Sequence, residues 1–331
     1  MGSIAWSTPF AIAIVPLGMI LNYVLIRTKF TKTMDVDVWN YWHFILSAAL
    51  SYYVCLMMGL TSVVSAIIGI AVGLGTFVVI LKLGDLIAPY WQEYYGLPGT
   101  TCCNVDAYYM WGIDWLVCKV IDFIPGLNKI NINAQWISDK FGSFGETSVI
   151  TFFCGIFISI VTKLDASTAI TMSVTLSACI ILVPKMVGML MEGLVPVSNA
   201  ARKFFKSHLG DDYDIYIGMD EALYLGDETG IQVSVIMIPI ALALAFLPGV
   251  TVFPIASLGS LCYTTCACSL FAKGDVFKTL VASTVLFAYS VEAYSFMAPI
   301  ATKVAIEAGF ITEAAGLVTG SGIEEFSNII I

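Results

Sequence analysis

Five long runs of this chain contain no Asp, Glu, Lys or Arg, and they constrain its fold more than any other feature. The runs are 4–26, 44–81, 166–184, 229–272 and 279–291. About 20 apolar residues let a helix cross the hydrocarbon core of a bilayer, so 44–81 and 229–272 each have room for two helices. Charged residues make up only 12% of the sequence, against roughly 25% in soluble domains. The sequence therefore predicts an all-α integral membrane protein that crosses the bilayer several times.

Basic residues at the ends of these runs predict the orientation of the chain. The first run has no Lys or Arg before it and is too long for the apolar region of a signal peptide, so we do not expect its cleavage. The basic residues that follow it place residue 1 outside and 27–37 in the cytoplasm by the positive-inside tendency. The later basic residues mostly agree with this orientation: Lys82, Arg202, Lys203, Lys206, Lys273 and Lys278.

The apolar runs and their helix breakers predict about eight membrane segments. The first should bend or break near Pro9 and Pro16. The uncharged stretch 147–162 is short for a full crossing, which favours a re-entrant or broken helix. The other predicted segments are two helices in 44–81, one over 166–190, two in 229–272 and one over 279–302.

Other features refine this plan. Gly69, Gly73 and Gly75 in the second helix of 44–81 should allow a neighbouring backbone to approach closely. The aromatic-rich stretch 107–124 suits the headgroup interface, on which it should lie or into which it should dip. A polar loop is predicted over 199–221.

A faint internal repeat links two of the apolar segments. Gly-Glu-Thr at 145–147 opens one segment, and Gly-Asp-Glu at 226–228 opens another, 81 residues later (227 − 146). An acid in the first turn complements the helix dipole, so both can be ordinary helix starts. Alternatively, they are the tips of paired discontinuous helices that meet at a central site, as in transporters built from repeats.

Ionisable groups inside apolar runs are costly, and they usually face a cavity or a charged partner. Carboxylates, with Asn and His beside them, would satisfy the hydroxyl groups of a polyol. The predicted substrate-binding residues are Glu146, Thr147, Asp227, Glu228, His43 and Asn40. Helix capping is the alternative role for Glu146 and Asp227, and a place in an aromatic belt is the alternative for His43.

Further charged candidates have simpler structural interpretations. Lys185 and Glu192 are seven residues apart on one helical face, which favours snorkelling or pairing. Glu292 could equally be a buried partner of a lysine. Asp85 is a further ionisable candidate close to an apolar run.

Several classes of protein are excluded or disfavoured. A net charge of −9 lacks the basic footprint of a nucleic-acid-binding protein. The closely spaced Cys262, Cys266 and Cys268 have no His or acid nearby to complete a zinc site, so the cysteines are expected to be mostly buried free thiols. There is no phosphate-binding loop, His-Glu-x-x-His pair or Gly-x-Ser-x-Gly elbow. No catalytic residue, metal or cofactor is predicted.

Six motifs, in order along essentially the whole chain, resemble the membrane-embedded IIC component of the galactitol-type phosphotransferase system. They are Asp-Val-Asp-Val-Trp-Asn-Tyr-Trp-His (35–43), Gln-Glu-Tyr-Tyr-Gly-Leu-Pro-Gly (92–99), Ile-Pro-Gly-Leu-Asn-Lys (124–129), Phe-Gly-Ser-Phe-Gly-Glu (141–146), Val-Pro-Lys-Met-Val-Gly-Met-Leu-Met-Glu-Gly (183–193) and Tyr-Ile-Gly-Met-Asp (216–220). Each motif alone is weak, but six in register are specific.

The resemblance implies a permease that moves a sugar alcohol, galactitol or a related polyol, across the bacterial cytoplasmic membrane. A separate IIB subunit would phosphorylate the sugar from a phosphocysteine recharged through IIA and HPr, so the chain would not be an enzyme on its own. Residues 1–331 would form a single membrane domain with no fused IIA or IIB. The similar ascorbate-type IIC proteins imply a homodimer with an inverted repeat and an elevator-like motion.

Three departures from the family pattern accompany this resemblance. Family members usually carry further apolar segments, about two helices, before the position that matches Gly2 of this chain, so the chain looks shortened at its N-terminus. The tips usually read Gly-Glu-Pro and Gly-His-Pro, in place of 145–147 and 226–228 here, and a usual His-Gly is replaced by Asn104-Val105. The alternative function is a proton- or ion-coupled secondary transporter in which Glu146, Asp227 or Glu292 carries the proton.

Overall fold

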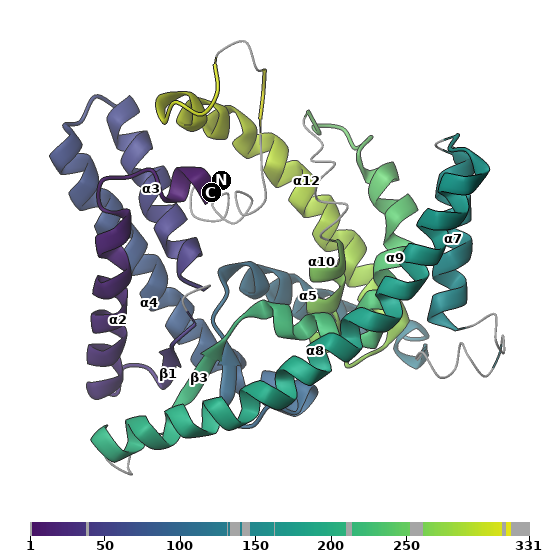
Figure 1. The fold of residues 1–331 in the computed structure, drawn as a ribbon, viewed down its shortest axis with the longest axis horizontal. Coiled ribbons are helices and arrows are strands. Elements are labelled where there is room, and N and C mark those ends of the chain that lie inside the picture. The colour runs from purple at the N-terminus through teal and green to yellow at the C-terminus, as the bar shows by residue number, and fades with distance from the viewer. Residues whose placement is uncertain are drawn as a thin grey trace.

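The computed structural model describes residues 2–37, 40–130, 132, 140, 146–161, 163–209, 214–251, 261–312 and 316–318, and most of them are helical (Figure 1). This confirms the predicted all-α class. The helices, with η marking 3-10 helices, are α1 (Gly2–Ala5), α2 (Ala11–Arg27), α3 (Tyr41–Met57), α4 (Ser62–Tyr95), α5 (Val105–Phe123), η2 (Leu127–Lys129), α7 (Thr147–Val161), α8 (Ala166–Leu209), η4 (Glu221–Gly226), α9 (Glu228–Leu244), α10 (Leu261–Ala267), α11 (Ser269–Ala272) and α12 (Val276–Glu307).

Three helices in the described part of the chain are long and apolar enough to cross a membrane: α4, α8 and α12. Shorter apolar helices accompany them in α2, α3, α7, α9 and the stretch Leu261–Ala272 that contains α10 and α11. These elements correspond to the predicted apolar segments. The first predicted segment is broken where expected, because Pro9 lies between α1 and α2, whereas Pro16 lies inside α2.

Helices α3 and α4 pack closely through two of the three glycines that the sequence singled out. A Cβ atom at Gly69 would lie 2.7 Å from the Ala48 carbonyl oxygen, and one at Gly73 would lie 2.8 Å from the Phe44 carbonyl oxygen. Among the described residues, nothing lies within 4 Å of where a Cβ at Gly75 would stand. Gly69 and Gly73 therefore face α3, and the prediction was wrong for Gly75, which lies on the open side of α4.

The predicted polar loop over 199–221 is wrong in its first half, because α8 continues to Leu209. Ala200 and Ala201 are strong helix formers, and Arg202 and Lys203 near the end of α8 complement the negative end of its dipole. Figure 1 shows α8 running from its hairpin partner α7 along the lower edge of the molecule to β3.

A small parallel sheet, which the sequence analysis did not predict, joins three segments that are far apart in the sequence. Its strands are β1 (Thr33–Asp35), β2 (Thr100–Cys102) and β3 (Tyr216–Met219). They are ordered β1-β3-β2, with Asp35 opposite Gly218 and Cys102 opposite Met219. Because the strands are parallel, their carboxyl ends meet at one edge, and two of the six sequence motifs meet there.

Helix α12 contributes residues to three separate apolar clusters of the core. Its C-terminal half packs with α1, α3 and α4, and its N-terminal half contributes Ala282 and Leu286 to the apolar cluster around the sheet. Val276, Phe287 and Val291 pack against α9. Helix α12 therefore links the α2–α4 group, at the left of Figure 1, with the cluster around the sheet and with α9 toward the right.

Candidate functional site

The N-terminal ends of α7 and α9 line one cavity, which we call the tip cavity. Its volume is about 320 Å³, and its lining residues are Glu146, Ser148, Ile180, Ile181, Lys185, Glu228 and Ile231. Glu146 directly precedes α7, and Glu228 is the first residue of α9. Two of the predicted substrate-binding residues, far apart in the sequence, therefore meet at one place.

The lining of the tip cavity combines charged and apolar groups. Glu146 and Glu228 supply carboxylate acceptors, and Lys185 of α8 supplies an ammonium donor. Isoleucines of α8 and α9 form an apolar wall. Such a lining fits a small molecule with many hydroxyl groups on a carbon chain, and small-ligand sites commonly have volumes of about 300–1,000 Å³.

Asp227 precedes the cavity residue Glu228 and has a capping geometry. One carboxylate oxygen accepts from the Gly230 backbone N–H at 2.6 Å, and the other accepts from the Tyr94 hydroxyl at 2.6 Å. These bonds fix the start of α9 and connect it to α4. Asp227 is not among the residues that line the tip cavity.

Asn40 and His43 belong to a different group, which we call the sheet-edge cluster: Asp35, Asn40, His43 and Asp220. Asn40 Nδ2 donates to Asp35 Oδ1 at 3.0 Å. Asp35, Asn40 and His43 are at most 2% exposed. Asp220 follows β3, and its negative charge interacts with Asp35 and with His43. The carboxyl edge of the sheet thus gathers polar groups from β1, β3 and the start of α3.

Asp35 is the most perturbed acid of the sheet-edge cluster. Burial raises its pKa to about 8, against the opposing effect of hydrogen bonds from Asn40 and from the Asp37 backbone. Within the described part of the chain, Asp35 Oδ2 and Asn40 Oδ1 are buried atoms that have no hydrogen-bond partner. Loss of solvation on burial is therefore the physical reason for the raised pKa of Asp35.

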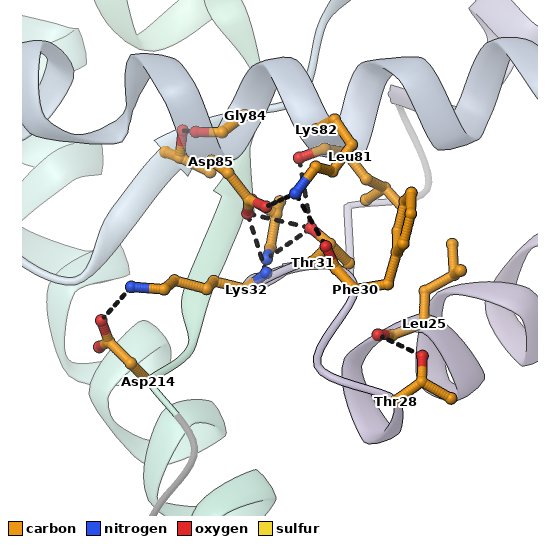
Figure 2. Close-up of polar contacts among 12 residues, drawn as sticks. Leu25, Thr28, Phe30, Thr31, Lys32, Leu81, Lys82, Gly84, Asp85 and Asp214 are labelled. Atoms are coloured by element: carbon orange, nitrogen blue, oxygen red, sulfur yellow. Dashed lines mark hydrogen bonds and ion pairs between the residues drawn. The ribbon is translucent and has the colours of Figure 1, made fainter.

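Asp85 is explained by structure rather than by solute binding. Its Oδ1 accepts from the Thr31 hydroxyl, the Lys32 backbone N–H and the Thr33 hydroxyl, at 2.8–2.9 Å. Lys82 lies 3.3 Å from its other oxygen (Figure 2). Asp85 therefore fastens the segment before β1 to α4.

The other predicted residues occupy varied positions. Thr147 begins α7, Glu192 is exposed on α8, and Glu292 of α12 lies against Gly249, with an oxygen 2.9 Å from where a Cβ would stand. Lys185 is the residue whose place in the tip cavity the sequence analysis missed. It belongs to the Val-Pro-Lys-Met motif, and that motif was the available signal.

Charged side chains at the ends of apolar helices, around a cavity of small-molecule size, define a class of protein: a membrane permease for a small polar solute. Comparison with known proteins identifies the family. The family model EIIC-GAT, described as the sugar-specific permease component of the PTS system (the phosphotransferase system), matches residues 1–316. The chain therefore belongs to this family of phosphotransferase system permeases.

Curated relatives agree with this assignment. The galactitol-specific EIIC component of the PTS system from Escherichia coli strain K12 is 29% identical over 314 residues, which are 95% of this chain and 67% of that protein. The protein of the same description from Escherichia coli O157:H7 gives the same values. A putative permease IIC component from strain K12 is 30% identical over 308 residues, 93% of this chain and 68% of that protein.

The family assignment establishes the general role of the chain. It is an integral membrane permease component that works with the IIB and IIA components of the phosphotransferase system. The phosphoryl transfer belongs to IIB, so the chain is not itself an enzyme.

Proposed function

We propose that this chain carries a sugar alcohol of the galactitol class across the bacterial cytoplasmic membrane as a multi-pass protein. The substrate binds in the tip cavity, where Glu146 and Glu228 accept hydrogen bonds from its hydroxyl groups. The observation that carries this proposal is the meeting of two carboxylates and Lys185 around one cavity of about 320 Å³. The galactitol-specific relatives support the choice of a polyol.

Thr147 and Asp227 support this site from the two helix ends, and Asn40 and His43 contribute through the sheet edge. Asp227 holds the start of α9 through Gly230 and Tyr94, so its role is to position Glu228. The chain from Asp220 of the sheet-edge cluster to Asp227 is the short helix η4. A change at the sheet edge would therefore be transmitted directly to the start of α9.

The partners follow from the family role. A IIB protein carries a phosphocysteine to the substrate, and IIA and HPr recharge it.

We also propose that residues 1–331 form one membrane domain, since a single family match spans 1–316. The permease forms a homodimer, for which the apolar membrane-length stretch of α8, none of it buried in the described chain, offers surface.

A binding screen tests the substrate assignment. Purified protein in detergent is titrated with hexitols, pentitols and hexoses by isothermal calorimetry, and galactitol or a related hexitol should bind best. Glu146→Gln should weaken that binding by at least tenfold, because an amide replaces a carboxylate that accepts charge-assisted hydrogen bonds.

The matched control is Glu192→Gln, which makes the same change at an exposed position of α8. It should bind as the wild type does. Equal weakening by both variants, or unchanged affinity in Glu146→Gln, would mean that Glu146 is only a helix-start residue and that the tip cavity is not the site.

A further inference from the structure

Two adjoining cavities form a groove beside the C-terminal part of α4, which we call the α4–α5 groove. They have volumes of about 480 Å³ and about 380 Å³ and share Tyr90, Trp115 and Phe271 in their walls. The larger cavity is lined mainly by apolar and aromatic side chains, and the smaller one also has charged residues in its lining. Neither cavity shares a lining residue with the tip cavity, so the groove is a separate feature.

The α4–α5 groove lies on the cytoplasmic side of the bilayer. By the positive-inside tendency, Lys82 of α4 marks the cytoplasmic surface, and so do Lys273 and Lys278. From Ser62 to Lys82 the helix rises about 30 Å at 1.5 Å per residue, which equals the thickness of the hydrocarbon core. Glu93, in the groove wall, is about 16 Å farther along α4, whereas the headgroup layer is only about 5–8 Å thick. This end of the groove is therefore open to the cytoplasm.

The groove exposes apolar surface at a level that lipid tails do not cover. In the described chain, Leu86 is 69% exposed, Tyr90 is 49% exposed and Trp115 is 47% exposed. Apolar surface in contact with water is costly, and a patch of it marks an interaction site. Aromatic side chains with charged groups around them are typical of protein–protein interfaces, where Trp and Tyr often supply most of the binding energy. The groove therefore fits a protein partner.

The charges in and beside the groove favour an anionic partner. Lys273 lies 3.7 Å from Glu93, and Lys278 lies 2.6 Å from Asp122, so each of these acids has a lysine partner. Lys119 also lines the groove, is exposed, and forms no ion pair within the described part of the chain. The groove is thus locally positive in a chain whose net charge is −9, and it complements a negative charge on the partner.

Two hydrogen bonds connect the groove with the start of α9. Tyr94, which lines the groove, donates from its hydroxyl to Asp227 at 2.6 Å. The carbonyl of Gly274, directly after a lining residue of the groove, accepts from the Thr229 hydroxyl at 3.2 Å. Asp227 and Thr229 flank Glu228 of the tip cavity. A partner in the groove is therefore in contact with the elements that position Glu228.

We infer that the α4–α5 groove is the docking surface for the IIB component and that Lys119 faces its phosphoryl group. The inference rests on the proposed function, in which a phosphocysteine of IIB reaches the sugar in the tip cavity. A phosphoryl donor that acts on an imported sugar approaches from the cytoplasm, where the groove opens. A phosphoryl group carries a charge of about −1.5 to −2 at pH 7, which matches the uncompensated lysine. Tyr90 and Trp115 pack against the surface of IIB around it.

Two lysines provide a matched pair of charge reversals. Lys119 of α5 and Lys303 of α12 are both exposed helical residues. Lys303 is about 38 Å along α12 from Lys278, which places it at the opposite surface of the bilayer. Lys119→Glu and Lys303→Glu therefore make the same chemical change, but only the first lies within reach of IIB.

Biolayer interferometry of the purified full chain in nanodiscs, with its IIB protein phosphorylated or unphosphorylated, measures the docking. The wild type should bind phosphorylated IIB more tightly than the unphosphorylated form. Lys119→Glu should weaken the binding of phosphorylated IIB by about tenfold or more and remove this preference, because like charges then face each other. Lys303→Glu should bind both forms as the wild type does.

A pair of tryptophans tests the aromatic wall of the groove in the same assay. Trp115→Ala should weaken the binding of both forms of IIB by about tenfold. Trp6 is 51% exposed, close to the 47% of Trp115, and it precedes α2 on the outer side of the membrane by the same orientation. Trp6→Ala should leave the binding of IIB unchanged.

Calorimetry of the same variants with galactitol separates this inference from the sugar assignment, because all of them should bind galactitol as the wild type does. Equal binding of IIB by Lys119→Glu and Lys303→Glu, or by Trp115→Ala and Trp6→Ala, would overturn the inference. Loss of galactitol binding in Lys119→Glu with IIB binding kept would assign the groove to the sugar instead. If the wild type failed to bind galactitol while IIB binding followed the variants as expected, the tip cavity would lose its proposed role and the docking surface would stand.

Discussion

At the scale of single residues, the charged groups of this permease divide into two kinds. Asp85 and Asp227 have their carboxylate oxygens occupied by hydrogen bonds that fasten helices and loops. Glu146, Lys185 and Glu228 instead line a cavity. Sequence alone gives both kinds the same appearance, an ionisable group beside an apolar run, and only the three-dimensional contacts separate them.

Asp35 makes the stability of the protein depend on pH. Burial raises its pKa to about 8, so between about pH 4 and pH 8 the folded protein holds a proton that the unfolded chain releases. The contribution of Asp35 to stability is therefore fully present below its ordinary pKa and is lost as pH rises toward 8. Asp35→Asn, which resembles the protonated acid, should lose less stability over that range.

Thermal unfolding of both proteins in detergent from pH 5 to pH 8 measures this effect. The difference in Tm between Asp35→Asn and the wild type should shift in favour of the variant as pH rises. Parallel curves across the whole range would show that Asp35 is ionised throughout.

At the scale of elements, the packing of α3 on α4 depends on which face of α4 a glycine occupies. Gly73→Ala should lower the free energy of unfolding by about 1–3 kcal/mol, because the new Cβ overpacks the contact at 2.8 Å from Phe44 O. Gly75→Ala, with open space around it, should be neutral or stabilise by up to about 1 kcal/mol through helix propensity.

Unfolding of the two alanine variants by heat, followed by circular dichroism in one detergent, compares them directly. If Gly75→Ala destabilised the protein as much as Gly73→Ala, the cost would come from the lost glycine and not from the α3 contact.

The apolar elements were predictable because a charge-free run is a local property that the membrane itself requires. The sheet was not, because β1, β2 and β3 have only three or four residues each and come from distant parts of the chain. Their hydrogen bonds depend on tertiary contacts, which the local periodicity of the sequence does not predict. For the same reason the sequence did not predict that Lys185 lines the tip cavity, because that position depends on α7 and α9 meeting beside α8.

At the scale of the whole molecule, the family match describes one activity: passage of a sugar through the bilayer, coupled to phosphorylation by a partner. The tip cavity is the site that we propose for the sugar. The chain spans 67% of the galactitol-specific relatives. The tip cavity lies wholly within the matched region, residues 1–316. The residues proposed to bind the sugar are therefore in the part that this chain shares with those proteins.

The most direct test is the chemical state of the sugar that this permease brings into cells. Cells that express the chain with its IIB and IIA partners are given radiolabelled galactitol, and the intracellular label is separated by chromatography. It should be sugar phosphate, formed only with phosphoenolpyruvate and absent without IIB. Accumulation of unmodified galactitol, driven by a proton gradient and independent of IIB, would contradict the assignment.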